Sequence, residues 1–288
     1  MSKVLKNKID FMVIFEVTNG NPNGDPDMDN APRTDIETGH GLVTDVCLKR
    51  KIRDYVAKRK AREAGYGIYI TAGIPTNRPE AAAIEATSEE AKEKQPYEAG
   101  EIVKKYLCDN FFDIRTFGAV LTSLSKNNLG DGRVNGPVQL CFGRSVDPID
   151  PQLITIDRIT VASEKEAEAK SSTMGRKWII PYAVYTVRGH ISAEKAKKTG
   201  FTEDDCELLM EALLNMFDDD ASSARPDMAV RKLIIFKHDS ATGNEKAWKL
   251  FDRVSVKRVS EGPARTFSDY EVKINTEDMP TGVECIIK

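Results

Sequence analysis

The chain has 288 residues, of which 40% are hydrophobic, and its formal net charge at pH 7 is −3. This length and composition exclude a disordered tail and predict one large domain, or one domain that carries sizeable insertions. No run of about 18 apolar residues occurs, and the N-terminus lacks the apolar stretch and cleavage site of a signal peptide. We therefore expect a cytoplasmic protein that contacts no membrane.

Cysteine usage and standard fingerprints bear on metals and cofactors. No P-loop, dinucleotide, GxSxG or HExxH fingerprint occurs, and we expect no cofactor and no metal. The five cysteines are widely scattered and never form a CxxC pair, which supports neither a disulfide framework nor a zinc site. We interpret them as reduced structural thiols: Cys47, Cys108, Cys141, Cys206 and Cys285.

The first predicted element is a buried strand over residues 9–17, a nearly continuous apolar run bounded by polar residues. A loop over residues 18–43 follows, rich in glycine, asparagine and proline, whose backbone N–H groups can come close to phosphates. Three aspartates in this loop alternate as in a calcium site. A proline inside the pattern and an isoleucine at its twelfth position argue against calcium.

A basic helix is predicted next, over residues 44–62, with Thr44 or Asp45 as its N-cap. Its apolar residues recur at helical spacing, so one face can pack on a core while the other presents cations outward. Such a face suits a polyanion, although charge runs are also common on merely solvated helix faces. Residues 49–62 hold one acid, Asp54, against eight bases: Lys49, Arg50, Lys51, Arg53, Lys58, Arg59, Lys60 and Arg62.

A strongly acidic segment compensates the positive charge of this helix. Residues 203–220 contain eight Asp and Glu and no Lys or Arg. We expect the acidic face to stay clear of a bound anion or to meet a basic partner. Residues 202–217 are predicted to form a capped amphipathic helix that turns inward Leu209, Leu213, Met216 and Phe217.

Further elements complete an α+β fold. Strands are predicted at 66–70, 138–143, 153–161, 178–191 and 231–237, and helices at 80–95 and 97–112. A polar run between Ala162 and Lys177 is interpreted as the tip of a long hairpin. The strong elements follow the order strand, helix, strand, strand, helix, strand, which is the ferredoxin-like order. A strand-like piece at 253–259 finds no predicted place in the sheet.

Several smaller motifs are candidates for chemistry. His40, His190 and His238 are isolated, and His40 alone is a weak candidate for acid–base work on RNA. Residues 113–118 and 130–136 are flexible polar segments that each carry an arginine. Residues 174–177 place a methionine beside two cations, which suits a wedge that unstacks bases, or else a methionine packed on its own hairpin.

Taken together, these motifs resemble a known family. The resemblance rests on the asparagine- and glycine-rich run at 19–26, on 33–35, on 44–54, on Asp-Ile-Arg-Thr-Phe-Gly at 113–118 and on Gly-Pro-Val-Gln-Leu at 136–140. These segments are similar to the backbone subunit of type I-C CRISPR surveillance complexes (Cascade), of the RAMP superfamily, and the similarity runs over most of the chain.

The resemblance implies a single RRM-like, ferredoxin-like palm over 1–288, an inserted finger region at about 66–112 and a β-hairpin thumb at about 155–181. It implies a non-enzymatic subunit that polymerises head to tail along CRISPR RNA and presents the guide to a target DNA strand. The remaining implied partners are the RNA-processing and large subunits of Cascade. A RAMP-type endoribonuclease, and a carbohydrate- or metal-binding protein built on the aspartate loop, are the alternatives.

Carried over residue by residue, the resemblance also implies an RNA site. Lys49, Arg50 and Arg53 match guide-backbone contacts, Met174 with Gly175 matches the thumb element, and Arg225 matches a loop along the same RNA, although serine and proline replace that loop's glycines. The residues predicted to contact RNA are Asn19, Asn21, Arg33, Thr44, Lys49, Arg50, Arg53, Arg115, Phe117, Arg133, Met174, Gly175, Arg176, Lys177, Ser222, Ser223 and Arg225.

Overall fold

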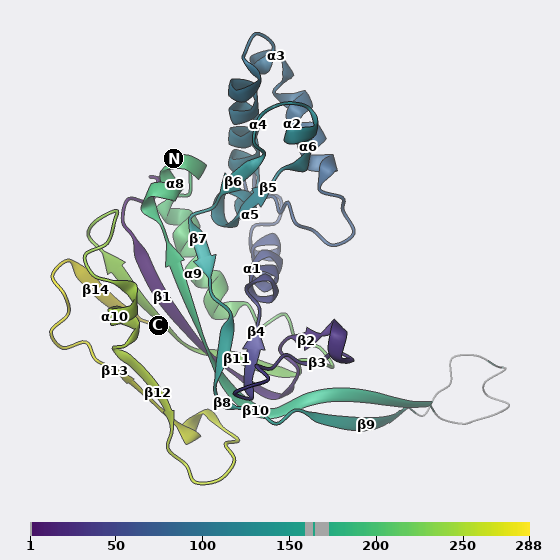
Figure 1. The fold of residues 1–288 in the computed structure, drawn as a ribbon, viewed down its shortest axis with the longest axis vertical. Helices are drawn as coiled ribbons and strands as arrows, with labels where there is room; N and C mark the ends of the chain where they lie inside the picture. Colours follow the sequence, from purple (N-terminus) through teal and green to yellow (C-terminus); the bar gives the residue numbers. More distant parts are fainter. Residues whose placement is uncertain (1, 159–163, 165–172) are drawn as a thin grey trace.

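A large antiparallel sheet forms the centre of the protein in this computed structural model, which describes residues 2–158, 164 and 173–288 (Figure 1). The strands lie in the order β14-β11-β1-β10-β8-β4, and β7 and β9 also pair with β10. Its strands are β1 (Ile9–Gly20), β4 (His40–Val43), β7 (Val138–Leu140), β8 (Gly143–Pro148), β9 (Gln152–Arg158), β10 (Thr173–Ile191), β11 (Asp227–His238) and β14 (Val283–Ile287).

The helices and short strands are arranged around this sheet, and the protein is of the α+β class. The helices are α1 (Asp45–Arg59), α2 (Asn77–Ala86), α3 (Ser88–Ala91), α4 (Pro96–Asn110), α5 (Phe112–Phe117), α6 (Thr122–Lys126), α8 (Ala193–Thr199), α9 (Glu203–Asn215) and α10 (Ala247–Phe251), with 3-10 turns at Pro26–Met28 and Phe267–Asp269. Within the described residues, two-stranded sheets pair β2 (Gly24–Asp25) with β3 (Ala31–Pro32), β5 (Gly118–Val120) with β6 (Arg133–Asn135), and β12 (Val254–Arg258) with β13 (Tyr270–Ile274).

Strand β1 is buried on both faces, as its continuous apolar sequence predicts. Phe11, Val13 and Phe15 belong to the core cluster beneath α1 and α9, whereas Met12 and Ile14 belong to a second cluster on the opposite face. Alternate side chains of a strand point to opposite faces. Both faces must therefore be covered. The elements β1, α1, β8, β10, α9 and β11 follow the predicted order of strands and helices, with the helices α2 to α6 inserted after α1.

The C-terminal region covers the second face of the main sheet. Leu250 and Phe251 of α10 and Tyr270 of β13 pack into the second cluster, on the side of the sheet away from α1 (Figure 1). The unplaced strand at 253–259 is β12, which pairs with β13 instead of joining the main sheet. This arrangement explains why its sequence fits no position in the ferredoxin-like order.

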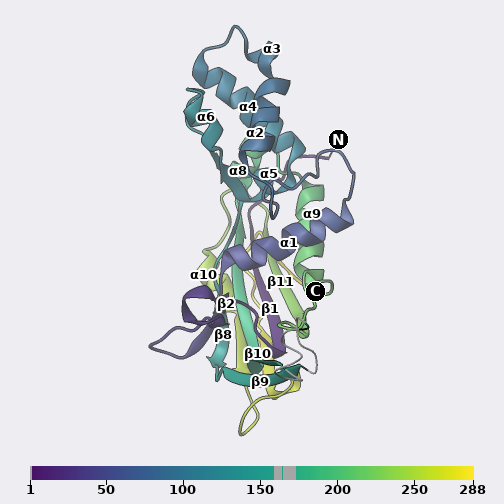
Figure 2. The same cartoon turned by 90° about the vertical axis from the view of Figure 1, so that its right-hand side faces the viewer.

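A helical lobe made of α2 to α6 stands beyond one end of the sheet (Figures 1 and 2). It has a core cluster of its own, which includes Tyr69, Leu107 and Leu124 and has Val134 packed against it. The strand predicted at 66–70 is wrong: only Gly67 forms a bridge, to Phe111, because the N–H groups of Tyr69 and Ile70 bind a carboxylate instead. The helix predicted at 80–95 is two short helices, α2 and α3.

The hairpin of β9 and β10 projects from the body of the sheet (Figure 1). Its pairs run from Gln152 with Ile179 to Arg158 with Thr173. Residues 159–163 and 165–172, which include most of the predicted tip, lie outside the described residues. Because β10 already begins at Thr173, residues 174–177 lie within a paired strand and not in the tip.

Candidate nucleic-acid interface

Helix α1 begins where the asparagine-rich loop ends, and side-chain hydrogen bonds fix that junction. Thr44 is the N-cap, and its hydroxyl accepts a hydrogen bond from the Cys47 N–H at 3.3 Å. The same hydroxyl donates to the Asn23 side-chain oxygen at 2.9 Å, and that oxygen also accepts from the Thr44 N–H at 2.9 Å. Thr44 therefore acts as a cap that ties the loop to the first turn of the helix.

The basic side of α1 faces acids of the same chain. Helices α1 and α9 lie side by side on one face of the sheet (Figure 2). Lys58 binds Asp219 at 3.3 Å and Arg59 binds Glu211 at 2.9 Å. Acids of the 203–220 run thus meet basic partners within their own chain, because both helices cover the same sheet face and their opposite charges compensate.

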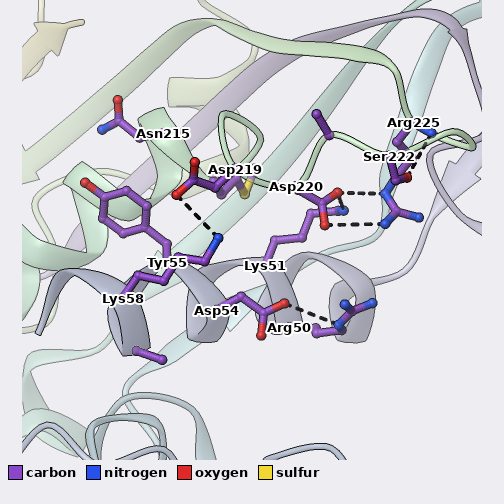
Figure 3. A pocket seen from close by; sticks show the side chains of 13 residues that line it. Arg50, Lys51, Asp54, Tyr55, Lys58, Asn215, Asp219, Asp220, Ser222 and Arg225 are labelled. Carbon is purple, nitrogen blue, oxygen red and sulfur yellow. Dashed lines mark hydrogen bonds and ion pairs between the residues drawn. The ribbon is translucent and has the colours of Figure 1, made fainter. Parts of the chain in front are cut away.

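The deepest of these contacts joins Lys51, Asp220 and Arg225 (Figure 3). The Lys51 side chain is 2% exposed and donates to Asp220, and the Arg225 Nε donates to the same carboxylate at 2.7 Å. Burial lowers the pKa of Lys51 despite its carboxylate partner. Burial alone would raise the pKa of Asp220, but hydrogen bonds from Lys51 and Arg225 outweigh it and leave that pKa below its ordinary value.

Two further cations of α1 point toward the helical lobe and not to solvent. Arg53 is 11% exposed and its Nε donates to the Asp113 carboxylate at 2.8 Å. Lys49 is 14% exposed and binds Asp45 at 2.9 Å, and both cations lie over the ring of Phe117, at 5.3 Å for Arg53 and 5.6 Å for Lys49. The prediction of a uniformly outward basic face is therefore wrong for Lys49, Lys51 and Arg53.

Arg115 and Phe117 are buried, each with 7% of its surface exposed. The Arg115 guanidinium binds both oxygens of the buried Asp205, at 2.7 and 3.0 Å, and so joins the lobe to the start of α9. Asp205 in turn caps its own helix together with Thr202. The prediction that Arg115 and Phe117 contact RNA is at odds with this burial, because their polar and aromatic groups already have partners within the chain.

What remains accessible is a groove between α1 and the segment after α9 (Figure 3). Arg50 and Lys58 both line this groove, and their side chains are 66% and 56% exposed. We call this feature the basic groove, and its main lining residues are Arg50, Lys51, Asp54, Tyr55, Lys58, Asn215, Asp219, Asp220, Ser222 and Arg225. Sequence reasoning did not select Lys58 or Asn215 as site residues, although the charge of Lys58 belongs to the same basic run.

Of the predicted loop residues, Ser222 and Arg225 line the groove. Asn21 is buried, and its N–H donates to the Ala224 carbonyl at 2.7 Å, which links the two predicted loops. Asn19 is exposed with a left-handed φ of 50°, and Arg33 binds Asp25 at 3.3 Å. The backbone groups of Ser222 and Arg225 form a turn, and Ser223 at its tip is exposed.

Other predicted residues lie elsewhere. Arg133 is exposed on β6, beside the helical lobe. Residues 174–177 lie on the projecting hairpin, where Met174 pairs with Asp157 and is 76% exposed. The alternative in which Met174 packs on its own hairpin is at odds with that exposure. The structure thus brings Arg50, Ser222 and Arg225 together, and leaves Arg133 and the hairpin residues apart from them.

The histidines have internal partners. The His40 Nδ1 lies 2.8 Å from the Ser145 carbonyl. His190 and His238 both hydrogen-bond the buried Asp10 carboxylate, which also binds Lys8 at 3.0 Å. Among the residues that the structure describes, no group of His, Cys, Asp or Glu side chains is arranged to hold a metal ion, and no helix is long and apolar enough to cross a membrane.

The fold and the groove describe an α+β protein with a cationic cleft beside an antiparallel sheet, and sequence comparison adds the family. The family model described as CRISPR-associated protein Cas7 matches residues 7–275. The chain therefore belongs to the Cas7 family.

Individual relatives are distant. A CRISPR-associated protein Cas7 of Haloferax volcanii is 24% identical over 216 residues, which are 70% of this chain and 62% of that protein, so the match spans less than two thirds of the relative. A solved chain described as a CRISPR RNA-guided surveillance complex, pre-nicking, shares the fold with a TM-score of 0.50 at 14% identity, over 80% of this chain and 78% of that one. Another, described as a CRISPR RNA-guided surveillance complex, gives a TM-score of 0.47 at 14% identity, over 80% and 68%.

Proposed function

We propose that this chain is an RNA-binding backbone subunit of a CRISPR surveillance complex and catalyses no reaction on the RNA. The carrying observation is the basic groove, in a chain of the Cas7 family, which joins Arg50 and Lys58 of α1 to Arg225 from a distant part of the sequence. Cations that contact phosphates position a nucleic acid without reading its bases. Such a subunit can hold any guide sequence and leave target choice to base pairing with DNA.

Type I-C is the subtype we propose, on the motifs at 19–26, 44–54 and 113–118. In this proposal the sheet with α1 and α9 is the RRM-like palm, the hairpin at about 155–181 is the thumb, and the insertion at about 66–112 forms the fingers. The core of the helical lobe draws on residues as far as Leu124 and Val134, which supports an insertion longer than the predicted one.

Copies of the chain would meet head to tail along the CRISPR RNA, a heterologous contact that yields an open filament. The RNA-processing and large subunits of Cascade are the other partners we propose. The alternative, an endoribonuclease, would use His40 or a lysine as acid or base. The His40 Nδ1 is engaged by the Ser145 carbonyl, which does not favour that role, and an in-line cleavage assay on guide-repeat RNA separates the two functions.

The direct test replaces the two exposed cations of the groove. The Arg50→Gln, Lys58→Gln double variant should bind single-stranded RNA at least about tenfold more weakly, and its salt dependence should flatten by about 0.7 in slope per lost phosphate contact. The matched control is Lys197→Gln, Lys198→Gln on α8, which removes the same charge from exposed positions outside the groove. Equal RNA affinity in the two double variants would refute the groove as the RNA site.

Measuring RNA bound to the purified protein is an independent test of the proposed function. The ratio of absorbance at about 260 nm to that at about 280 nm reports bound nucleic acid, and high salt should remove it because phosphate contacts are salt-dependent. A wild-type protein that binds no RNA at low salt would refute the proposed function itself.

A further inference from the structure

Two partly exposed carboxylates bind the cations at the C-terminal end of α1. Glu211 of α9 and Asp219 of the following segment bind the adjacent cations Arg59 and Lys58 in the last turn of α1. We call these two carboxylates the acidic rim. Asp219 lines the basic groove directly and binds Lys58 there (Figure 3).

The acidic rim differs from the buried ion pairs around it. Asp220 is 12% exposed and holds Lys51 and Arg225 in place, so its loss would leave a buried cation without a partner. Asp219 is 74% exposed and its partner Lys58 is 56% exposed, and Glu211 is 40% exposed against 56% for Arg59. Exposed pairs of this kind contribute about 0 to 1 kcal/mol. The rim therefore adds little to folding, yet it occupies Lys58, which lines the groove, and the neighbouring Arg59.

We propose that the acidic rim is an internal competitor of RNA phosphates, which lowers the affinity of the groove and so sets how strongly each copy of the chain holds RNA. The proposal rests on the proposed function and concerns the regulation of that same groove. In the free protein Lys58 and Arg59 are bound by Asp219 and Glu211. An incoming phosphate must either displace these carboxylates or lie beside them, and like charges in one site repel each other.

Removing a groove carboxylate should therefore raise RNA affinity, whereas substitutions in a binding groove usually lower it. A cation that is already paired with its own carboxylate contributes less to phosphate binding than a free cation does. Removing the carboxylate frees that charge, so affinity should rise and the salt dependence should become steeper by about 0.7 in slope for each freed cation on single-stranded RNA. A change in long-range charge alone would raise affinity slightly and leave the slope unaltered.

The chain offers a matched control one residue away. Asp218 is exposed in the same segment, and no ion pair is formed by it among the described residues. Asp218→Asn and Asp219→Asn therefore change the net charge equally at neighbouring positions, and only the second releases Lys58. Glu211→Gln tests the other carboxylate, although it also removes the negative charge from the acceptor of the hydrogen bond that Tyr55 donates at 2.8 Å.

The experiment measures binding of the full chain to a single-stranded RNA of mixed sequence by filter retention over a range of KCl concentrations. We expect Asp219→Asn to bind about fivefold more tightly than wild type, with a steeper slope, and Asp218→Asn to stay within about twofold. Affinity and slope in Asp219→Asn equal to those of Asp218→Asn, or weaker binding than wild type, would overturn the inference while leaving the proposed function intact. If the wild type binds no RNA, the proposed function fails and this inference fails with it.

Discussion

Arg53 and Arg50 lie three residues apart on one basic helix, but the structure assigns them opposite roles. The Arg53 Nε donates to the Asp113 carboxylate at 2.8 Å, where the two side chains are 11% and 1% exposed. Arg50 is 66% exposed and binds Asp54 of its own helix. We therefore predict that Arg53→Gln damages folding, whereas Arg50→Gln damages only RNA binding.

The magnitude follows from the burial of Asp113. Removing one partner of a buried ion pair costs about 3 to 5 kcal/mol. In Arg53→Gln the N–H groups of Tyr69 and Ile70, at 2.8 and 3.0 Å, should still bind the carboxylate. We therefore expect a cost near the lower end of this range. A loss of about 3 kcal/mol lowers Tm by about 6 to 12 °C in a protein of this size. Arg50→Gln should stay within about 0.5 kcal/mol of wild type, as surface substitutions usually do.

Thermal and urea unfolding of both variants, followed by circular dichroism, tests this prediction, together with RNA binding of the folded proteins. The control is Arg53→Lys, which keeps the charge but loses the planar guanidinium and should be intermediate in stability. Equal stability of Arg53→Gln and Arg50→Gln would refute the reasoning, because it would mean that the Asp113 carboxylate does not depend on α1.

Two other regions carry predictions. Burial alone would raise the pKa of Asp10, but hydrogen bonds from His190, His238 and Lys8 outweigh it and hold that pKa well below its ordinary value. Because its folded-state pKa is lowered, the ionised Asp10 carboxylate stabilises the folded protein above the unfolded-state pKa, and this stabilisation is lost as pH falls. The free energies of unfolding of wild type and Asp10→Asn should therefore approach each other from about pH 5 to about pH 3. Urea titrations that show a constant difference would contradict this. On the hairpin, Met174→Gly should leave RNA affinity nearly unchanged yet weaken capture of target DNA, because exposed Met174 would organise bases while cations supply the attraction. When single mismatches are placed at each position along the guide, capture of target DNA should tolerate them at regular intervals. Equal sensitivity at every position would refute the wedge role.

The local elements of this protein could be predicted from its sequence because each has a short-range cause. The apolar run at 9–17 is buried on both faces of β1, and Thr44 and Thr202 cap the two helices expected there. The order of strands and helices follows from the periodicity of each segment. The resemblance of separated motifs was likewise visible in the sequence, and the match over residues 7–275 agrees with it at the level of the Cas7 family.

Which charges are available for binding was decided by the tertiary structure alone. Lys51 meets Asp220, Arg53 meets Asp113 and Arg115 meets Asp205, in pairs separated by 169, 60 and 90 residues. No local pattern reports such pairings, because they depend on α1, α5 and the α9 region meeting in the folded chain. A count of charges along a helix predicts its total field, but only the packing of its neighbours determines which of those charges remain exposed to a partner.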